Sequence, residues 1–171
     1  MDKLHRYQVE AVDFLMDRLY IQNKPGAGLF LDPGLGKTRI ALETAKTLSW
    51  LGEAKKVLVI APLRPVYSVW PAEIKKWGFD FSTSIIHGTP NQRVKAMNAD
   101  ADIYLVNPEG VDWLVRQDYV PWDLMIVDES TKFKNWTSKR TKAVRKLAPK
   151  IPHRVVLTGT PAPNSLADLF P

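Results

Sequence analysis

The stretch LFLDPGLGKT, residues 29–38, joins an apolar run to a lysine and a threonine through a turn that holds two glycines. Gly34 and Gly36 allow the backbone to curl so that successive amide groups point toward an anion, which side chains would obstruct. Lys37 adds a positive charge for the outer phosphates of a nucleotide, and the Thr38 hydroxyl can reach a magnesium ion. The stretch therefore predicts a phosphate-binding loop between a buried strand and a helix.

This loop departs from the Walker A pattern at one position, because Leu31 stands where that pattern has its first glycine. The alternative is a glycine turn that ends a strand and is followed by a helix-capping threonine. The apolar run before the turn and the helical pattern after it favour the phosphate loop.

Short apolar runs alternate with helical patterns along the chain. The runs lie at 28–31, 57–61, 84–86, 103–106, 124–127 and 154–158, and the helical patterns at 4–19, 37–50, 66–77 and 138–148. Apolar strands without polar alternation, separated by helices, indicate an α/β fold with a mostly parallel sheet and helices on both faces. In such sheets ligands bind at the carboxyl ends of the strands, where functional residues are expected.

Two acidic residues, Asp128 and Glu129, directly follow the apolar run at 124–127. Carboxylates at the end of a buried strand are costly unless they have a partner. Asp128 is placed to hold magnesium through water, and Glu129 to polarise an attacking water. A surface turn that begins with Asp-Glu is the alternative, which the phosphate loop upstream disfavours.

Composition and charge bound the function further. A chain of 171 residues suits one domain, and the absence of cysteine excludes disulfides and thiolate metal sites and fits a cytoplasmic protein. No apolar stretch is long enough to span a bilayer, so we expect no membrane association. The three histidines, His5, His87 and His153, are too scattered to suggest a metal site.

Positive charge is concentrated in one segment. Residues 132–154 hold nine Lys or Arg and no acidic residue, so the remainder of the chain has a net charge of −3 against the total of +6. An anionic partner and a solvated basic face are both compatible with this pattern. The residues left open between these two interpretations are Lys132, Lys134, Lys139 and Arg140.

The order of these motifs resembles that of the superfamily 2 helicases and translocases, most closely the SNF-type DNA translocases. Residues 4–15 (LHRYQVEAVDFL) are similar to the opening Q-type motif, 31–38 to motif I, and 57–77 (VLVIAPLRPVYSVWPAEIKKW) to motif Ia. YLVNPEGV at 104–111 resembles the Tyr-Glu segment, with Pro108 at the tyrosine position. WDLMIVDESTKFKN at 122–135 resembles motif II, with Ser-Thr in place of Ala-His, and LTGTPAPNSLADLF at 157–170 resembles motif III. The compact loops are similar to those of phage or prokaryotic members.

The resemblance implies a RecA-like P-loop NTPase domain that uses ATP and Mg²⁺. Lys37, Asp128 and Glu129 would be catalytic, Thr38 and Asp128 would hold the metal, and Gln8 would bind the adenine with Tyr7 packed nearby. The nucleotide-binding residues implied in this way are Tyr7, Gln8, Pro33, Gly34, Leu35, Gly36, Lys37, Thr38 and Arg39. Thr158, Gly159 and Thr160 would link the nucleotide state to the grip on DNA.

The resemblance also implies movement on double-stranded DNA, bound mainly through its phosphates. The DNA-binding positions implied are Pro62, Leu63, Arg64, His87, Gly88, Asn107 and Glu109. The sequence stops at Pro171, so we expect an N-terminal lobe over 1–171 whose partner, a second RecA-like lobe, is absent. Such a lobe would bind ATP weakly and hydrolyse it slowly, since a missing arginine finger typically costs about 10³ to 10⁵ in rate.

Three other functions remain in view. An RNA helicase lobe of the same superfamily is disfavoured because Gln8 lies within the opening helical pattern rather than in a separate upstream loop. A nucleotide-gated DNA-binding module without turnover is disfavoured by intact Lys37, Asp128 and Glu129. A small-molecule P-loop kinase would need an arginine-rich lid that the sequence lacks, and it would leave motif III unexplained. For localisation we expect the cytoplasm of a bacterium or of a phage-infected host.

Overall fold

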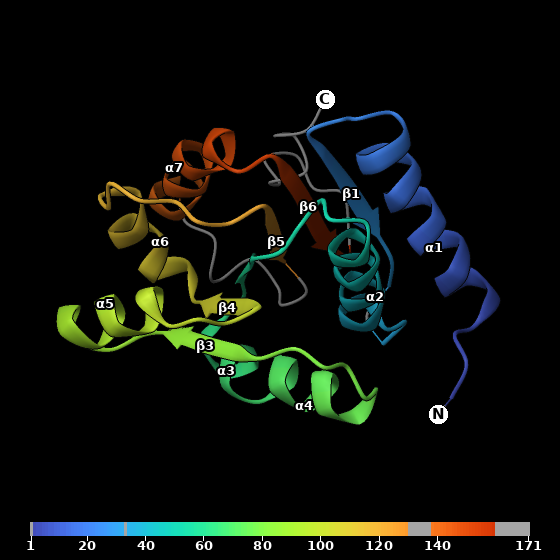
Figure 1. Ribbon diagram of the computed structural model, residues 1–171, viewed down its shortest axis with the longest axis horizontal. Helices are drawn as coiled ribbons and strands as arrows, with labels where there is room; N and C mark the ends of the chain where they lie inside the picture. The colour runs from blue at the N-terminus through green and yellow to red at the C-terminus, as the bar shows by residue number, and fades with distance from the viewer. Residues whose placement is uncertain (1, 33, 130–137, 160–171) are drawn as a thin grey trace.

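The computed structural model describes residues 2–32, 34–129 and 138–159 of the chain (Figure 1). Within them, six strands form one sheet in the order β1-β6-β5-β2-β4-β3, and every neighbouring pair is parallel. The strands are β1 Gly26–Phe30, β2 Val57–Ile60, β3 Thr83–Ile86, β4 Ile103–Val106, β5 Leu124–Asp128 and β6 His153–Thr158. The predicted α/β fold with a parallel sheet is confirmed, with small shifts at the strand ends.

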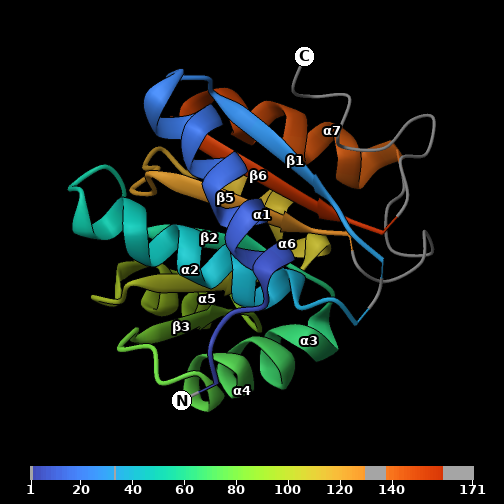
Figure 2. The ribbon, with the colours of Figure 1, turned by 90° about the vertical axis from the view of Figure 1, so that its right-hand side faces the viewer.

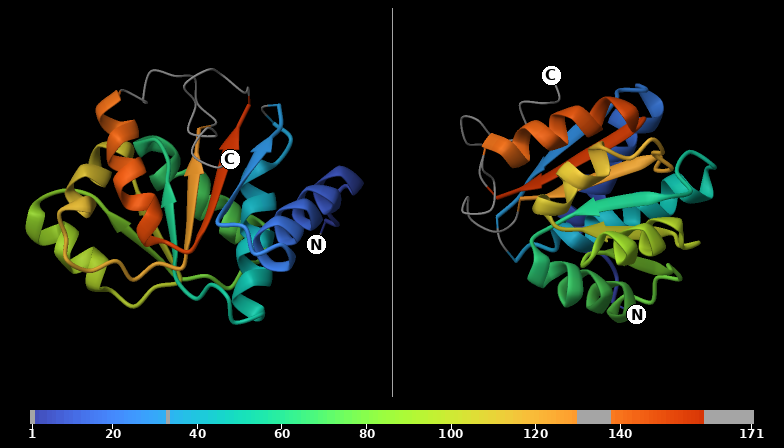
Figure 3. Two further views of the ribbon diagram at one scale, coloured as in Figure 1. Left: turned by 90° about the horizontal axis from the view of Figure 1, so that it is seen from above. Right: turned by 90° about the vertical axis from the view of Figure 1, so that its left-hand side faces the viewer.

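Helices cover both faces of the sheet (Figure 3). They are α1 Arg6–Met16, continued by the π-helical turn η1 Asp17–Ile21, α2 Lys37–Trp50, α3 Leu63–Tyr67, α4 Val69–Lys76, α5 Pro90–Asn98, α6 Pro108–Val115 and α7 Ser138–Leu147, followed by the 3₁₀ turn η2 Ala148–Lys150. Helices α1 to α4 pack on one face and α5 to α7 on the other. Figure 2 shows α1 and α2 in front of the sheet.

Alternate residues of the central strands face the two helical layers. In β2, Val57 and Val59 belong to the core under α1, α2 and α4, whereas Leu58 and Ile60 belong to the core under α5, α6 and α7. All four side chains are buried. In a strand covered on both faces, an apolar residue at every position stabilises the folded state, which explains the unbroken apolar runs in the sequence.

Two helices, α5 and α6, were not predicted from the sequence, although both carry start signals. Thr89 caps α5 through a reciprocal pair of hydrogen bonds with Gln92, and prolines stand at the first turns of α5 and α6. The predicted helix over 66–77 is interrupted at Ser68 and becomes α3 and α4. Pro71 accounts for the break, because it has no N–H to donate to the carbonyl of Tyr67.

The strand order places β6 between β1 and β5. Because all strands are parallel, the loop after β1 and the residues after β5 emerge at the same edge of the sheet. That edge carries the predicted phosphate loop and the predicted acidic pair. Among the described helices, none combines the length and apolar character needed to cross a bilayer.

Candidate functional site

The loop after β1 has the backbone that its glycines predict. Gly34 and Gly36 have φ of +84° and +79°, a region that other residues rarely adopt, and α2 begins directly at Lys37. A Cβ atom on Gly36 would lie 2.5 Å from Nε2 of Gln8, so this position also lacks room for a side chain. Pro33, another predicted nucleotide-binding residue, lies outside the described residues.

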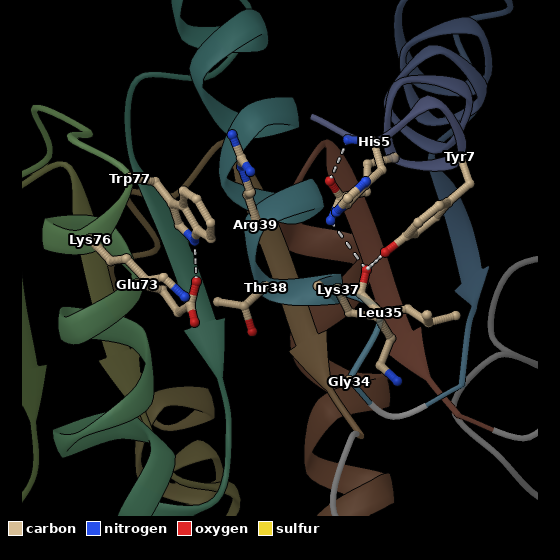
Figure 4. Close-up of a pocket in the computed structure, with 12 residues that line it drawn as sticks. His5, Tyr7, Gly34, Leu35, Lys37, Thr38, Arg39, Glu73, Lys76 and Trp77 are labelled. Atoms are coloured by element: carbon tan, nitrogen blue, oxygen red, sulfur yellow. Dashed lines mark hydrogen bonds between the residues drawn. The ribbon is translucent and has the colours of Figure 1, made fainter. Parts of the chain in front are cut away.

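Two residues of α1 hold one carbonyl of this loop. The Leu35 oxygen accepts hydrogen bonds from the Tyr7 hydroxyl at 3.0 Å and from Nε2 of Gln8 at 3.3 Å (Figure 4). The Gln8 side-chain oxygen accepts a further bond from the His5 amide at 2.9 Å. In a trans peptide the carbonyl and the next N–H point in opposite directions. The Gly36 amide is therefore directed away from α1, and Tyr7 and Gln8 help to set the conformation of the loop.

Lys37 is buried at the start of α2. Its ammonium group donates a hydrogen bond to the Leu31 carbonyl at 2.7 Å. Burial lowers the pKa of Lys37, and attraction to the carboxylates of Asp128 and Asp32 opposes that shift. Asp128 ends β5 and Lys37 follows the loop after β1, so the parallel sheet places these two predicted site residues at the same end of its strands.

The acidic pair stands at the end of β5. Asp128 is 2% exposed, and its Oδ2 accepts a hydrogen bond from the indole Nε1 of Trp70 at 3.2 Å. Glu129 follows, with its amide donating to the Leu157 carbonyl of β6 at 2.8 Å. Asp128 is therefore a buried carboxylate at the end of β5, and the main chain of Glu129 is fixed against β6.

The end of β6 is also attached to the start of the phosphate loop. The Leu31 amide donates to the Thr158 carbonyl at 3.1 Å, so β6 supports both the loop and Glu129. Thr158 is buried and Gly159 follows the strand, while Thr160 lies outside the described residues. Two of the three predicted coupling positions thus lie between the loop and the acidic pair.

A cavity of about 490 Å³ opens between α1, α2 and α4 beside the loop. Its lining residues are His5, Tyr7, Gln8, Gly34, Leu35, Gly36, Lys37, Thr38, Arg39, Glu73, Lys76 and Trp77. Figure 4 shows one wall formed by α4 and the opposite wall by the start of α1, with α2 between them. All the predicted nucleotide-binding residues that the structure describes line this single cavity.

The α4 wall was not predicted from the sequence. The Trp77 ring lies 3.8 Å from the Arg39 guanidinium and 4.5 Å from the Lys76 ammonium, measured to the ring centroid. Its indole N–H donates to Glu73. Trp77, at the end of the stretch that resembles motif Ia, was the sequence signal for this wall. From the sequence alone it is interpreted as a core-packing residue. Arg39 contacts this wall rather than pointing freely into the cavity.

The donor set fits a magnesium-bound nucleotide. Across the ranges that the structure describes, no group of three or more His, Cys, Asp or Glu could hold a metal alone. Magnesium in phosphate-transfer sites is usually held by one or two protein groups, with phosphate oxygens and waters completing its shell. Thr38 and Asp128 provide such groups beside the cationic Lys37, so the residues suit a metal that arrives with its phosphates.

The predicted DNA-binding residues follow three neighbouring strands at the same edge of the sheet. Leu63 and Arg64 are exposed at the start of α3, next to Pro62, and His87 and Gly88 follow β3. The Tyr67 hydroxyl lies 2.9 Å from Nδ1 of His87 and joins these two segments. Tyr67 is 53% exposed and was not predicted as part of this face.

The segment that follows β4, with Asn107 and Glu109, forms its own polar network. Nδ2 of Asn107 donates to Oε2 of Glu109 at 2.8 Å, and Glu109 also pairs with Arg140 of α7. Asn107 is buried, and its side chain is engaged in this network rather than exposed for DNA. Arg140 likewise has an acidic partner, Lys139 is exposed, and Lys132 and Lys134 lie outside the described residues.

A glycine loop with a buried lysine, facing an acidic residue across one edge of a parallel sheet, defines a RecA-like P-loop domain. The chain belongs to the SNF2-related domain family, whose model matches residues 7–171. It is similar to the Sulfolobus solfataricus SWI2/SNF2 ATPase core in complex with dsDNA, with a TM-score of 0.78 and 30% identity over 98% of this chain and 34% of that one. The chain is also similar to the Sulfolobus solfataricus SWI2/SNF2 ATPase core domain, with a TM-score of 0.76 and 28% identity over 99% of this chain and 34% of that one.

Similar sequences come from a phage and from yeast. Protein p41 of Acyrthosiphon pisum secondary endosymbiont phage 1 is 40% identical over 80% of this chain and 32% of its own length. The ISWI chromatin-remodeling complex ATPase ISW1 of Saccharomyces cerevisiae is 29% identical over 98% of this chain and 15% of its own length. The chain therefore spans about a third or less of the relatives it matches.

Proposed function

We propose that this chain is the ATP-binding motor lobe of an ATP-dependent DNA translocase or helicase, which couples ATP hydrolysis to movement on double-stranded DNA. The observation that carries the proposal is a cavity of about 490 Å³ lined by the glycine loop, Lys37 and Thr38, at the end of the parallel sheet where β5 ends in Asp128. The similar proteins support it, because they include a chromatin-remodeling complex ATPase and an ATPase core in complex with dsDNA. The similar phage protein supports the cytoplasm of a bacterium or of a phage-infected host as its location.

In this proposal the nucleotide lies along the cavity. The adenine occupies the space between Gln8 and the α4 wall, and the phosphates meet the amides of the loop and the start of α2. One side-chain hydrogen of Gln8 is used by Leu35, and its second is available to the base. Lys37 already lies at the loop, where its charge can attract the outer phosphates.

The metal supplied with the nucleotide offsets charge on the phosphates, and the chain orients the other reactants. Thr38 and Asp128 would hold Mg²⁺, and Glu129 would orient the attacking water. A second RecA-like lobe would close the site from the other side. The lobe alone is then expected to bind ATP weakly and to hydrolyse it slowly.

DNA is proposed to lie across the edge formed by the residues after β2, β3 and β4. Arg64 and the exposed amides after these strands would contact phosphates, which requires no reading of sequence. The Tyr67–His87 pair adds two polar groups to this face. Binding is expected to weaken steeply as salt concentration rises.

Nucleotide binding and turnover test the proposal directly. Binding of a fluorescent ATP analogue with Mg²⁺ should be measured for the unsubstituted chain, Lys37→Ala and Glu129→Gln. We expect binding to be lost in Lys37→Ala and retained in Glu129→Gln, while the slow hydrolysis of the unsubstituted chain disappears in Glu129→Gln. Equal binding by Lys37→Ala would refute the site.

The nucleic acid is tested by adding duplex DNA or duplex RNA to the same assays. Binding of DNA in preference to RNA is expected. Preference for RNA would favour the RNA helicase interpretation, and DNA binding that responds to ATP without any turnover would favour a nucleotide-gated module.

A further inference from the structure

We propose that Trp70 is a positioning residue that fixes the carboxylate of Asp128 in the orientation needed to hold the metal. This inference rests on the proposed nucleotide site and assigns a role to a residue outside the cavity lining. The contact joins α4 on one face of the sheet to the end of β5, across a sequence separation of 58 residues.

Both partners are shielded from water. Trp70 is 0% exposed and packs in the core with Ile74 of the same helix, and Asp128 is 2% exposed. A carboxylate removed from water is costly unless donors satisfy it. An indole has one N–H and no acceptor, so Trp70 can only donate, and its 3.2 Å bond to Oδ2 is of the kind that an ionised carboxylate requires.

The packing of Trp70 allows this hydrogen bond to orient the Asp128 carboxylate. A large ring enclosed in a close-packed core cannot change rotamer without displacing its neighbours. The indole N–H is therefore a fixed donor, and it resists rotation of the Asp128 carboxylate. Partners that orient metal ligands in this way commonly change metal affinity roughly 10- to 100-fold when removed.

The same helix also shapes the far end of the site. Two turns beyond Trp70, Trp77 directly follows α4 and stacks on Arg39 in the cavity wall. Helix α4 thus carries the anchor of the metal-facing carboxylate and the wall proposed to face the base. A single rigid element sets the distance between the two ends of the nucleotide site.

The matched test compares Trp70→Phe with Trp122→Phe. Trp122 is also buried, at 2% exposure, but its Nε1 has no hydrogen-bond partner among the residues that the structure describes. Both substitutions remove the same atoms from a core, and only the first removes a donor to Asp128. Thermal unfolding of each variant measures the shared packing cost.

Binding of a fluorescent ADP analogue should be titrated against Mg²⁺ for both variants. We expect Trp70→Phe to raise the Mg²⁺ concentration for half-maximal binding by about tenfold or more, with Mg²⁺-free binding unchanged. Trp122→Phe should keep the unsubstituted Mg²⁺ dependence. In an Asp128→Asn background, Trp70→Phe should add no further shift in Mg²⁺ dependence, because the carboxylate it orients is gone.

Two results overturn the inference in different ways. Equal Mg²⁺ dependence of Trp70→Phe and Trp122→Phe refutes the role of Trp70 and leaves the nucleotide site standing. Absence of Mg²⁺-dependent binding in the unsubstituted chain refutes the site and the inference together.

A second measurement, which needs no substitution of Trp70, is the indole N–H resonance in NMR. Asp128→Asn should shift the resonance of Trp70 and leave that of Trp122 in place, and an unshifted Trp70 would contradict the contact.

Discussion

The ammonium group of Lys37 donates a hydrogen bond to the carbonyl oxygen of Leu31, the residue at the start of its own loop, at 2.7 Å. The lysine side chain thus lies against the loop. An ammonium group has three donors, so Lys37 can keep this bond and still contact a phosphate. This hydrogen bond therefore ties the lysine to the start of the loop.

This burial predicts a pH dependence of nucleotide binding. Burial lowers the pKa of Lys37 from its usual 10.5, against the attraction of Asp128 and Asp32. A bound polyphosphate raises that pKa again, so binding takes up a proton at pH values between the two. Affinity should fall as pH rises through that window and should be flat below it. Titration of nucleotide affinity against pH checks this, and an affinity that stays constant up to pH 10.5 would contradict the lowered pKa.

The same shift predicts the sign of a stability change. Between the lowered pKa of folded Lys37 and 10.5, the unfolded chain binds a proton that the folded chain does not. The contribution of Lys37 to the free energy of unfolding should therefore increase with pH in this window. Denaturant unfolding of the unsubstituted chain and Lys37→Met at several pH values measures it. A difference between the two that stays constant with pH would contradict the lowered pKa.

Gly36→Ala should impair binding far more than Gly52→Ala. The two glycines have φ of +79° and +77°, so alanine costs about 1 kcal/mol of backbone strain at either position. Only at Gly36 would the added Cβ meet another group, Nε2 of Gln8 at 2.5 Å, and nothing lies within 4 Å at Gly52. We expect nucleotide affinity to drop by roughly tenfold or more in Gly36→Ala and to be unchanged in Gly52→Ala. Similar losses in both variants would show that strain alone matters.

Tyr7→Phe should weaken nucleotide binding through the loop. It removes the hydroxyl that binds the Leu35 carbonyl at 3.0 Å and keeps the ring. A hydrogen bond of this kind contributes about 0.5 to 1.5 kcal/mol, so a roughly two- to tenfold loss of affinity is expected. Tyr20→Phe, at an exposed tyrosine in η1, is the matched control. Calorimetric titration with ADP and Mg²⁺ would reveal an unaltered affinity if Tyr7 only packs.

Arg64→Ala should reduce the salt dependence of DNA binding. Arg64 is exposed at the start of α3, and loss of one phosphate contact should lower the slope of log affinity against log salt by about one. Arg116→Ala is the matched control, because Arg116 ends α6 at the opposite edge of the sheet, where it pairs with Asp112. Fluorescence anisotropy with duplex DNA at several salt concentrations measures both slopes. Equal slopes would remove α3 from the proposed DNA face.

The sequence was sufficient to predict the parallel sheet and the position of the glycine loop and the acidic pair at one end of its strands. Buried parallel strands appear in the sequence as unbroken apolar runs. The glycines before Lys37 and the acidic pair at the end of β5 are local patterns, so they can be recognised before the strand order is known. The contact of Trp70 with Asp128 could not be predicted, since it depends on how α4 packs against β5. The position of Trp77 and Glu73 in the cavity wall could not be predicted either, because it depends on how α4 packs beside α2. Helices α5 and α6 were missed because few apolar residues mark the former and a short Pro-initiated turn begins the latter.

Strand β6 gives its carbonyls to two neighbours, one on each side, at Leu31 and at Glu129. A displacement of the end of β6 would therefore move the start of the glycine loop and the main chain of Glu129 together. A structural change at Thr158 would thus affect both segments at once, because one strand end is bonded to each of them.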